Sequence, residues 1–258
     1  MENTGKYIYC IIRTEQERNF GNIGIGGGTG GGDNEITTIG LGDLAMVVSD
    51  SPLGKYPVSR ENLLAHQKVV EEVMKDFTLL PVRFCTIAPA AVNIRNLLER
   101  RRKEFRTLLG QMDFKIELGV KAIWRDMDSI FREIAEGDRR IASLRRKISG
   151  DGRTGVQAKM ELGRTVERAL AEKKEAEAGA IISVLRRASF DWKPGRVSDD
   201  KMVMNASFLV DKAREREFDS LVEDFSENYK ERIRFMYAGP LPPYNFVSVT
   251  IHPEEWEI

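Results

Sequence analysis

The sequence predicts an α+β protein with two domains, ferredoxin-like antiparallel sheets with packed helices, and a long helical hairpin. Three observations support this prediction. Short β-forming segments alternate with amphipathic helical segments, one strand has a long period of two, and a seven-residue apolar repeat follows that strand. We place an N-terminal domain at residues 1–111 and a C-terminal domain at residues 112–258, with the hairpin inserted at residues 126–188.

The N-terminal domain is predicted from the order of its strands and helices. Tyr7–Ile12 is apolar and rich in β-formers, so we expect a buried strand. One amphipathic helix is expected after Ser59, which is a suitable N-cap, and another from Pro89 to about Leu109. The other strands are expected at residues 35–41, 43–49 and 79–87. This order predicts a mostly antiparallel sheet with helices on one face.

A glycine-rich stretch separates the first two strands. Residues 21–32 read GNIGIGGGTGGG, which is too rich in glycine for a helix or a strand, so we expect a flexible loop. A formal dinucleotide-binding pattern lies inside it, at Gly26, Gly28 and Gly31. That pattern needs a helix directly after it, and here a strand is expected, so we predict no cofactor.

The C-terminal domain begins with a long alternating strand at residues 114–124, and a helical hairpin follows. Two helices are expected on either side of a glycine-bearing loop at residues 150–155, the second running over residues 156–188. Lys174 and Glu177 interrupt the apolar seam of the second helix, so we expect a partly solvated hairpin that projects from its domain. The seam of the first helix is a coiled-coil-like repeat made by Met127, Ile130, Ile134, Ile141, Leu144 and Ile148.

The rest of the C-terminal domain is predicted as strand, helix and strand. The strands are expected at residues 202–210 and 233–237, and Asp211 is expected to cap the helix between them. Residues 239–243, rich in proline, are expected to form an extended turn before a last short strand at residues 244–250. This order predicts a ferredoxin-like arrangement, with the hairpin in the first crossover.

Composition restricts the function classes. The 258 residues include 40 basic and 40 acidic side chains, so the formal net charge of +0 gives no general attraction to nucleic acid. No apolar run approaches the roughly 20 residues that span a bilayer, and Met1–Lys6 lacks the pattern of a signal peptide. We therefore expect a cytoplasmic protein that is not integral to a membrane. Cys10 and Cys85 are expected to be reduced and buried, the alternatives being a disulfide or a reactive thiol.

Residues typical of catalysis are sparse. His66 and His252 are the two histidines, and neither has a second metal ligand at a suitable spacing. A nucleophile pair of Cys85 and His66 is conceivable, but nothing in the sequence supplies a third, orienting group. The chain has no phosphate-binding loop and no GxSxG turn. The basic cluster at residues 100–103 is interpreted as a solvated helix face or a contact for an acidic protein. The prediction is a protein without enzymatic activity.

Four segments, spread in order over nearly the whole chain, carry a family resemblance. They read YIYCII at residues 7–12, LLAHQKVVEEVM with LPVRFCT at residues 63–86, IELGVKAIW at residues 116–124, and GPLPPYNFV at residues 239–247. Together they resemble the GvpF/GvpL family of gas vesicle proteins. Cys10 and Cys85 stand where that family has small residues, often glycine, and Leu241 stands where an aromatic residue is common.

The resemblance implies a function as well as a fold. It implies a two-domain α+β protein without known catalysis, associated with gas vesicles as a minor structural component or an assembly factor. It also implies binding to other gas vesicle proteins, chiefly the small hydrophobic shell protein. Shell subunits expose apolar, strand-forming surface before assembly, and a partner with an exposed sheet edge or apolar groove would shield it.

Four residues are candidate contacts with partners. Arg83 is a charged residue inside the apolar strand LPVRF, where it forms a structural ion pair, is exposed, or docks a partner. Tyr244, Asn245 and Phe246 belong to a stiff proline-rich segment that either packs between the domains or binds a partner.

Three rival interpretations remain open at this point. The first is a regulatory ferredoxin-like module that binds a small molecule. The second is an enzyme that uses Cys85 as a nucleophile. The third is a coiled-coil scaffold that acts through residues 126–188.

Overall fold

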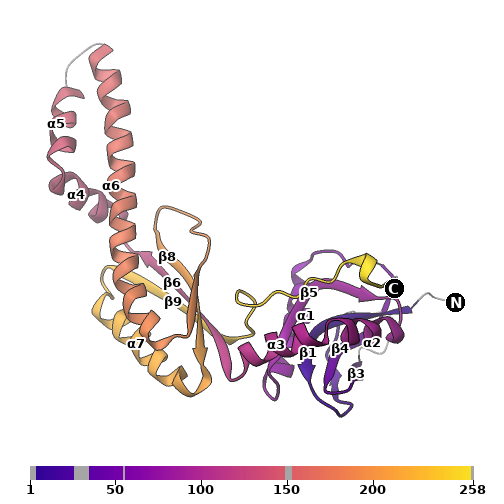
Figure 1. Ribbon diagram of the computed structural model, residues 1–258. Helices are drawn as coiled ribbons and strands as arrows, with labels where there is room; N and C mark the ends of the chain where they lie inside the picture. Colours follow the sequence, from indigo (N-terminus) through magenta and orange to yellow (C-terminus); the bar gives the residue numbers. More distant parts are fainter. Residues whose placement is uncertain (1–3, 26–34, 55, 149–152, 257–258) are drawn as a thin grey trace. The chain divides into compact units, whose positions relative to one another are not determined.

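The computed structural model describes residues 4–25, 35–54, 56–148 and 153–256. The chain divides into two compact units (Figure 1). Unit 1 comprises Met1–Glu117 together with Gly239–Ile258, and unit 2 comprises Leu118–Ala238. The C-terminal segment thus belongs to unit 1, whereas the sequence led us to place it in the second domain. The reason is that the apolar residues after Gly239 are buried in unit 1. A domain boundary drawn from the order of segments along the chain cannot show this return.

Two predictions fall largely outside the described residues. The glycines of the formal dinucleotide-binding pattern and most of the glycine-rich loop lie in residues 26–34, and much of the expected hairpin loop lies in residues 149–152.

Unit 1 contains a five-stranded antiparallel sheet with the order β2-β3-β4-β1-β5. The strands are β1 (Thr4–Arg13), β2 (Asn19–Asn22), β3 (Glu35–Leu41), β4 (Leu44–Pro52) and β5 (Leu79–Ala88). β1 is central, and every residue from Tyr7 to Ile12 has an exposed fraction of 0%. The predicted buried strand is therefore confirmed. A shift of register between Ile8 and Cys10 marks a bulge in β1.

The described part of unit 1 also contains three α-helices, α1 (Arg60–Met74), α2 (Ala91–Arg100) and α3 (Arg102–Met112), and a short 3-10 helix at Pro253–Trp256. The side chain of Ser59 caps α1 as predicted, by accepting a hydrogen bond from the backbone N–H of Asn62 at 3.2 Å. The helix expected after Pro89 is divided in two at Arg101, whose backbone leaves the helical region (φ −102°, ψ 15°).

The helices of unit 1 cover both faces of its sheet. The core cluster around α1 includes Tyr7, Tyr9 and Ile12 of β1 but no residue of α2 or α3. Ile8 and Ile11 are also fully buried, and alternation along a strand directs them to the opposite face. Our expectation of helices on one face was wrong for this unit. The uninterrupted apolar run of β1 is typical of a strand that is covered on both sides.

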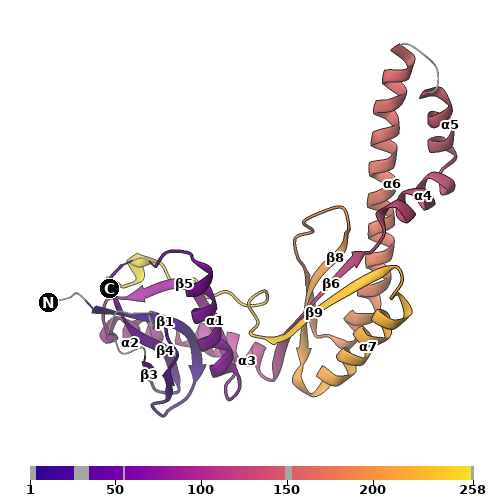
Figure 2. The same ribbon diagram turned by 180° about the vertical axis from the view of Figure 1, so that it is seen from behind.

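Unit 2 contains a four-stranded sheet with the order β7-β8-β6-β9 (Figures 1 and 2). The strands are β6 (Lys115–Trp124), β7 (Asp191–Pro194), β8 (Met202–Asp211) and β9 (Ile233–Leu241), and α7 (Glu215–Asn228) joins the last two. The period-two strand is confirmed as β6, whose alternating residues from Ile116 to Trp124 are buried. β7 was not predicted, because four mostly exposed residues with a proline carry no apolar period. The ferredoxin-like description of the sheets stays a prediction.

The hairpin is formed by α4 (Met127–Gly137), α5 (Arg139–Ile148) and α6 (Arg153–Leu185). Its first arm was expected to be one helix and is instead two. The chain is extended at Asp138, whose carboxylate accepts a hydrogen bond from the backbone N–H of Arg140 at 2.8 Å. The expected apolar seam is buried at Ile130, Ile134, Ile141 and Leu144.

Ion pairs hold the base of the hairpin. Glu177, which breaks the seam of α6, pairs with Arg232 at 2.6 Å and accepts a hydrogen bond from the indole N–H of Trp124 at 2.7 Å. Arg232 also pairs with Glu133 of α4, and Lys173 lies 2.8 Å from the same carboxylate. These cations lower the pKa of Glu133 to about 2. The polar interruption of α6 therefore joins the hairpin to its sheet.

Candidate functional site

The first candidate site is the outer edge of β9 in unit 2. β9 is the terminal strand of its sheet, with no further strand beside it in the described ranges of the chain. Among its nine residues only Ile233 is buried, while Met236 and Tyr237 are 48% and 39% exposed. An exposed edge strand has free backbone donors and acceptors that can pair with another chain.

Aromatic contacts anchor one face of β9. The ring of Phe235 lies 6.0 Å from that of Phe225, and the ring of Tyr237 stacks at 6.3 Å on Phe218 of α7. The hydroxyl of Tyr237 donates a hydrogen bond to Asp219. Burial and this carboxylate raise the pKa of Tyr237. β9 is thus held to α7 by its aromatic side chains, while Met236 projects from the opposite face.

The second candidate site is the predicted segment at residues 244–246, which lies in unit 1. Asn245 binds the carboxylate of Glu117 twice, through its backbone N–H at 2.8 Å and through its side-chain amide. Glu117 is only 2% exposed, so these hydrogen bonds stabilise a buried charge. Tyr244 is 37% exposed, and burial of its ring raises the pKa of its hydroxyl. Phe246 is half-buried.

Arg83 takes no part in the hydrogen bonds between Asn245 and Glu117. Its side chain is exposed on β5 and forms no ion pair with any described residue. It lines a cavity of about 430 Å³ in unit 1, together with Cys85, Thr86 and His252. A parallel bridge between Val82 and Val249 brings β5 next to the C-terminal segment.

A buried polar network connects the motifs of unit 1. The hydroxyl of Tyr7 lies 2.9 Å from Nδ1 of His66 and accepts a hydrogen bond from the backbone N–H of Cys85 at 2.9 Å. His66 also hydrogen-bonds the backbone of Val82, and its ring stacks on Tyr9 at 5.5 Å. Burial lowers the pKa of His66 to about 4, so the ring is neutral at pH 7. Nδ1 then accepts a hydrogen bond from the hydroxyl of Tyr7, and both groups stay neutral, which makes this a structural network.

The two cysteines are free. Cys10 is buried as expected, and burial raises the pKa of its thiol. Cys85 is half-buried and has a left-handed backbone with φ +65°, a conformation that favours glycine. Its sulfur accepts a hydrogen bond from the backbone N–H of Tyr56 at 3.2 Å. This backbone requirement gives a physical reason for the small residue that the resembled family has there.

Sequence reasoning missed three parts of these sites. Glu117 was seen only as a polar position in an alternating strand, and its partner lies 128 residues further along the chain. The partnership of His66 with Tyr7 was missed as well, although the motifs that contain them were noted. The exposure of β9 could not be found, because strand order decides which strand is at an edge.

Comparison with known proteins gives the family. The model of the gas vesicle synthesis protein GvpL/GvpF family matches residues 5–248. The chain belongs to the GvpL/GvpF family. Gas vesicle protein F of Streptomyces sp. (strain CB03234) is 28% identical over 94% of this chain and 99% of its own length. Gas vesicle protein L of the same strain is 26% identical over 95% of this chain and 93% of its own length.

A solved structure of the GvpL/GvpF family supports the fold. The crystal structure of the gas vesicle protein GvpF from Anabaena sp. PCC7120 has a TM-score of 0.84 and 22% sequence identity, and the match covers 96% of this chain and 100% of that one. The α+β fold class predicted from the sequence is therefore confirmed.

No helix in the described part of the chain combines the length and apolar character needed to cross a membrane. Within the same ranges, no three His, Cys, Asp or Glu side chains are grouped so that they would hold a metal ion.

Proposed function

We propose that this family member is a non-enzymatic assembly or nucleation factor, or a minor structural component, that binds the hydrophobic gas vesicle shell protein. We also propose that the binding site is the outer edge of β9. The observation that supports this proposal is the exposure of β9, in which a terminal strand leaves Met236 and Tyr237 accessible.

The chemistry of an edge strand fits a strand-forming partner. A shell subunit that pairs with β9 would satisfy its own backbone groups and cover its apolar side chains before it reaches the vesicle. Met236 suits such a contact because its flexible thioether adapts to differently shaped apolar surfaces. The contacts of Phe235 and Tyr237 with α7 would keep the edge extended without a partner.

A pull-down with a charged edge tests the proposal. Met236→Lys places a cation on an exposed position of β9, where lysine opposes strand pairing. We expect the tagged variant, in cells that express the full vesicle gene set, to recover at least several-fold less shell protein than the wild type. Val92→Lys is the matched control, because Val92 is 58% exposed on α2 and lies far from β9 in the sequence. Equal recovery by both variants would rule out the β9 edge.

The same experiment separates the rival scaffold interpretation. Deletion of residues 126–188 would abolish recovery if the hairpin carried the shell contact, and would preserve it if β9 does. The small-molecule module remains the alternative, and it predicts a saturable rise in melting temperature with a metabolite.

A further inference from the structure

The cavity of about 430 Å³ in unit 1 lies beside β5, the terminal strand of its sheet. Residues 83–87 of β5 contribute one part of its lining, and residues 250–253 with Trp256 contribute another. Leu53 and Gly54 complete the lining in the described part of the chain. Small-molecule sites in proteins usually have volumes of about 300–1,000 Å³ and mostly apolar linings. The cavity therefore has the size of a small-molecule site.

A wide bulge in β5 forms the first part of this lining. In the pairing of β1 with β5, Ile8 lies opposite Thr86 and Cys10 lies opposite Pro81. Between these two points the chain advances two residues along β1 and five residues along β5. The extra residues of β5 cannot follow a regular ladder. Bulges redirect side chains and are common next to active sites.

Hydrogen bonds fix the backbone of this bulge. The backbone N–H of Cys85 donates to the hydroxyl of Tyr7 at 2.9 Å, and the hydroxyl of Thr86 donates to the backbone carbonyl of Arg83 at 2.7 Å. The sulfur of Cys85 accepts a hydrogen bond from the backbone N–H of Tyr56 at 3.2 Å. The protein itself therefore holds Arg83 and Cys85 at the positions from which they line the cavity.

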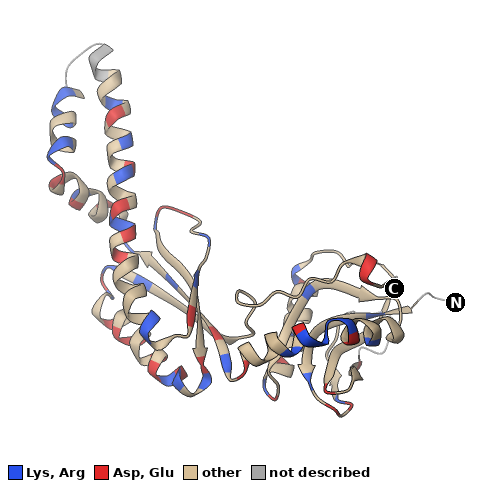
Figure 3. Ribbon diagram, in the orientation of Figure 1, with Lys and Arg blue, Asp and Glu red and all other residues tan. Residues whose placement is uncertain are grey.

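The C-terminal part of the lining is fixed by α2 and by the junction of α2 and α3. Arg101, at this junction, donates to the backbone carbonyl of Thr250 at 2.9 Å and pairs with the carboxylate of Glu255 at 3.4 Å. The side-chain amide of Asn93 donates to the backbone carbonyl of Trp256 at 2.7 Å. Figure 3 marks the basic residues of these helices in blue and the acidic residues of the C-terminal 3-10 helix in red. Both parts of the lining are thus preformed.

The charge of the cavity is one-sided. Arg83 is exposed and forms no ion pair with a described carboxylate, and no Asp or Glu is among the described residues that line the cavity. Most of the other lining residues are apolar, including Phe84, Ile87 and Ile251. A fixed cation next to apolar surface suits a ligand with a negative group on an apolar body.

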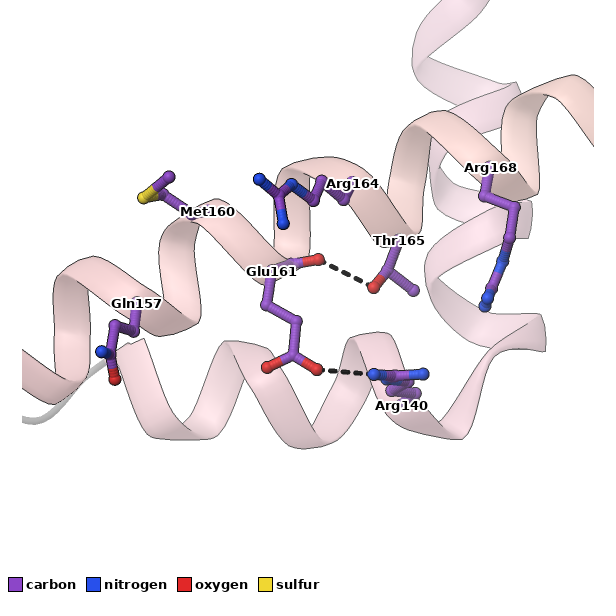
Figure 4. Close-up of a pocket in the computed structure, with 7 residues that line it drawn as sticks. All are labelled: Arg140, Gln157, Met160, Glu161, Arg164, Thr165 and Arg168. Atoms are coloured by element: carbon purple, nitrogen blue, oxygen red, sulfur yellow. Dashed lines mark hydrogen bonds and ion pairs between the residues drawn. The ribbon is translucent and has the colours of Figure 1, made fainter.

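The larger cavity between α5 and α6 lacks this combination. It measures about 570 Å³, and its described lining residues are polar except for Met160. Glu161 of α6 points toward Arg140 of α5 and pairs with it at 2.6 Å (Figure 4). This carboxylate already takes the place that an anionic ligand would take beside Arg140. The cavity of unit 1 is therefore the better candidate for binding an anion.

We propose that the cavity of unit 1 binds a small molecule that has one carboxylate on an apolar body. The planar guanidinium of Arg83 pairs with the carboxylate through two parallel hydrogen bonds. The apolar body lies against Phe84, Ile251 and Trp256. No residue of β9 is among the described residues that line the cavity, so this proposal and the proposed shell-protein contact can fail independently.

Alkylation of Cys85 reports whether the cavity is occupied. Cys85 lines the cavity and Cys10 is fully buried, so iodoacetamide should modify Cys85 first in the folded chain. The probes are acetate, butyrate, hexanoate and phenylacetate, each compared with its uncharged amide. We expect hexanoate and phenylacetate to slow this alkylation several-fold, in a saturable manner, and to raise the melting temperature. Acetate, which has the charge without an apolar body, should protect least, and the amides should have little effect.

Two substitutions of equal charge separate Arg83 from general charge effects. Arg83→Gln should abolish the preference for acids over amides. Arg95→Gln removes the same charge from an exposed position of α2 that is not part of this lining, and should behave as the wild type. Modification of Cys10, measured in the same mass spectra, shows whether a variant has unfolded.

Three results would overturn the proposal. They are equal protection by acid and amide, protection that is unchanged in Arg83→Gln, and the absence of protection by all of these acids. Arg83→Gln should also recover as much shell protein as the wild type in the pull-down. Loss of that recovery, with no protection of the wild type by any acid, would assign Arg83 to a protein contact instead.

Discussion

β1 and β9 are both strands of this protein's sheets, yet they differ in their position within the sheet and in the burial of their side chains. β1 is central in unit 1, and its residues from Tyr7 to Ile12 are entirely buried. β9 is terminal in unit 2, and only one of its nine residues is buried. Both lie in or next to motifs that carry the family resemblance. The position of a strand in its sheet therefore decides whether its side chains are buried in the core or left accessible.

The largest expected effect comes from truncating the buried strand. Ile11→Ala removes a fully buried side chain, so we expect a loss of about 2–5 kcal/mol in the free energy of unfolding. Met236→Ala in β9 should change the free energy of unfolding by less than about 0.5 kcal/mol, because the side chain of Met236 is exposed. Urea denaturation of both variants checks the contrast. Equal losses would show that β9 is also a core strand in solution.

The next effect is a pH dependence from His66. Its pKa is about 4 in the folded chain, against an ordinary value of 6.5 when unfolded. The unfolded chain therefore binds more protons between these values, and stability should fall as the pH decreases from about 6.5 to about 4, by roughly 3 kcal/mol. Denaturation as a function of pH measures this. In the variant His66→Gln, the free energy of unfolding should fall less between these pH values. A pH dependence of stability equal to that of the wild type would contradict the buried network.

A smaller effect is expected at the predicted C-terminal segment. Asn245→Ala removes one of two hydrogen bonds to the buried carboxylate of Glu117, so we expect a loss of about 1–3 kcal/mol. The variant Glu117→Gln/Asn245→Ala should lose less than the sum of the two single variants, because the residues are in contact. Additive losses would mean that the bond contributes little. A large loss of shell-protein binding with unchanged stability would instead make residues 244–246 a docking surface.

The fold was predictable wherever the pattern was local. The uninterrupted apolar run of Tyr7–Ile12 and the alternation of residues 114–124 each correspond to one strand. The break at Asp138 was not anticipated, because the seven-residue repeat continues across it and one aspartate is enough to cap a new helix. The return of residues 239–258 to unit 1 depends on pairings between residues more than a hundred positions apart, such as Asn245 with Glu117.

The candidate sites were predictable only in part. Residues 244–246 were identified from their stiffness and aromatic content, and the structure gives Asn245 a partner that the sequence does not reveal. Arg83 was singled out as a charge in an apolar strand and is simply exposed. Exposure of an edge strand follows from strand order, which no residue in β9 encodes by itself.

The most direct test of the β9 edge as the shell-protein site is photo-cross-linking in vesicle-producing cells. A photoreactive amino acid would replace Met236 in one strain and Val92 in another, and mass spectrometry would identify the cross-linked partner. We predict a cross-link to the shell protein from position 236 and not from position 92. Cross-links from both positions alike, or from neither in cells that still form vesicles, would contradict the assignment of β9 as the binding edge.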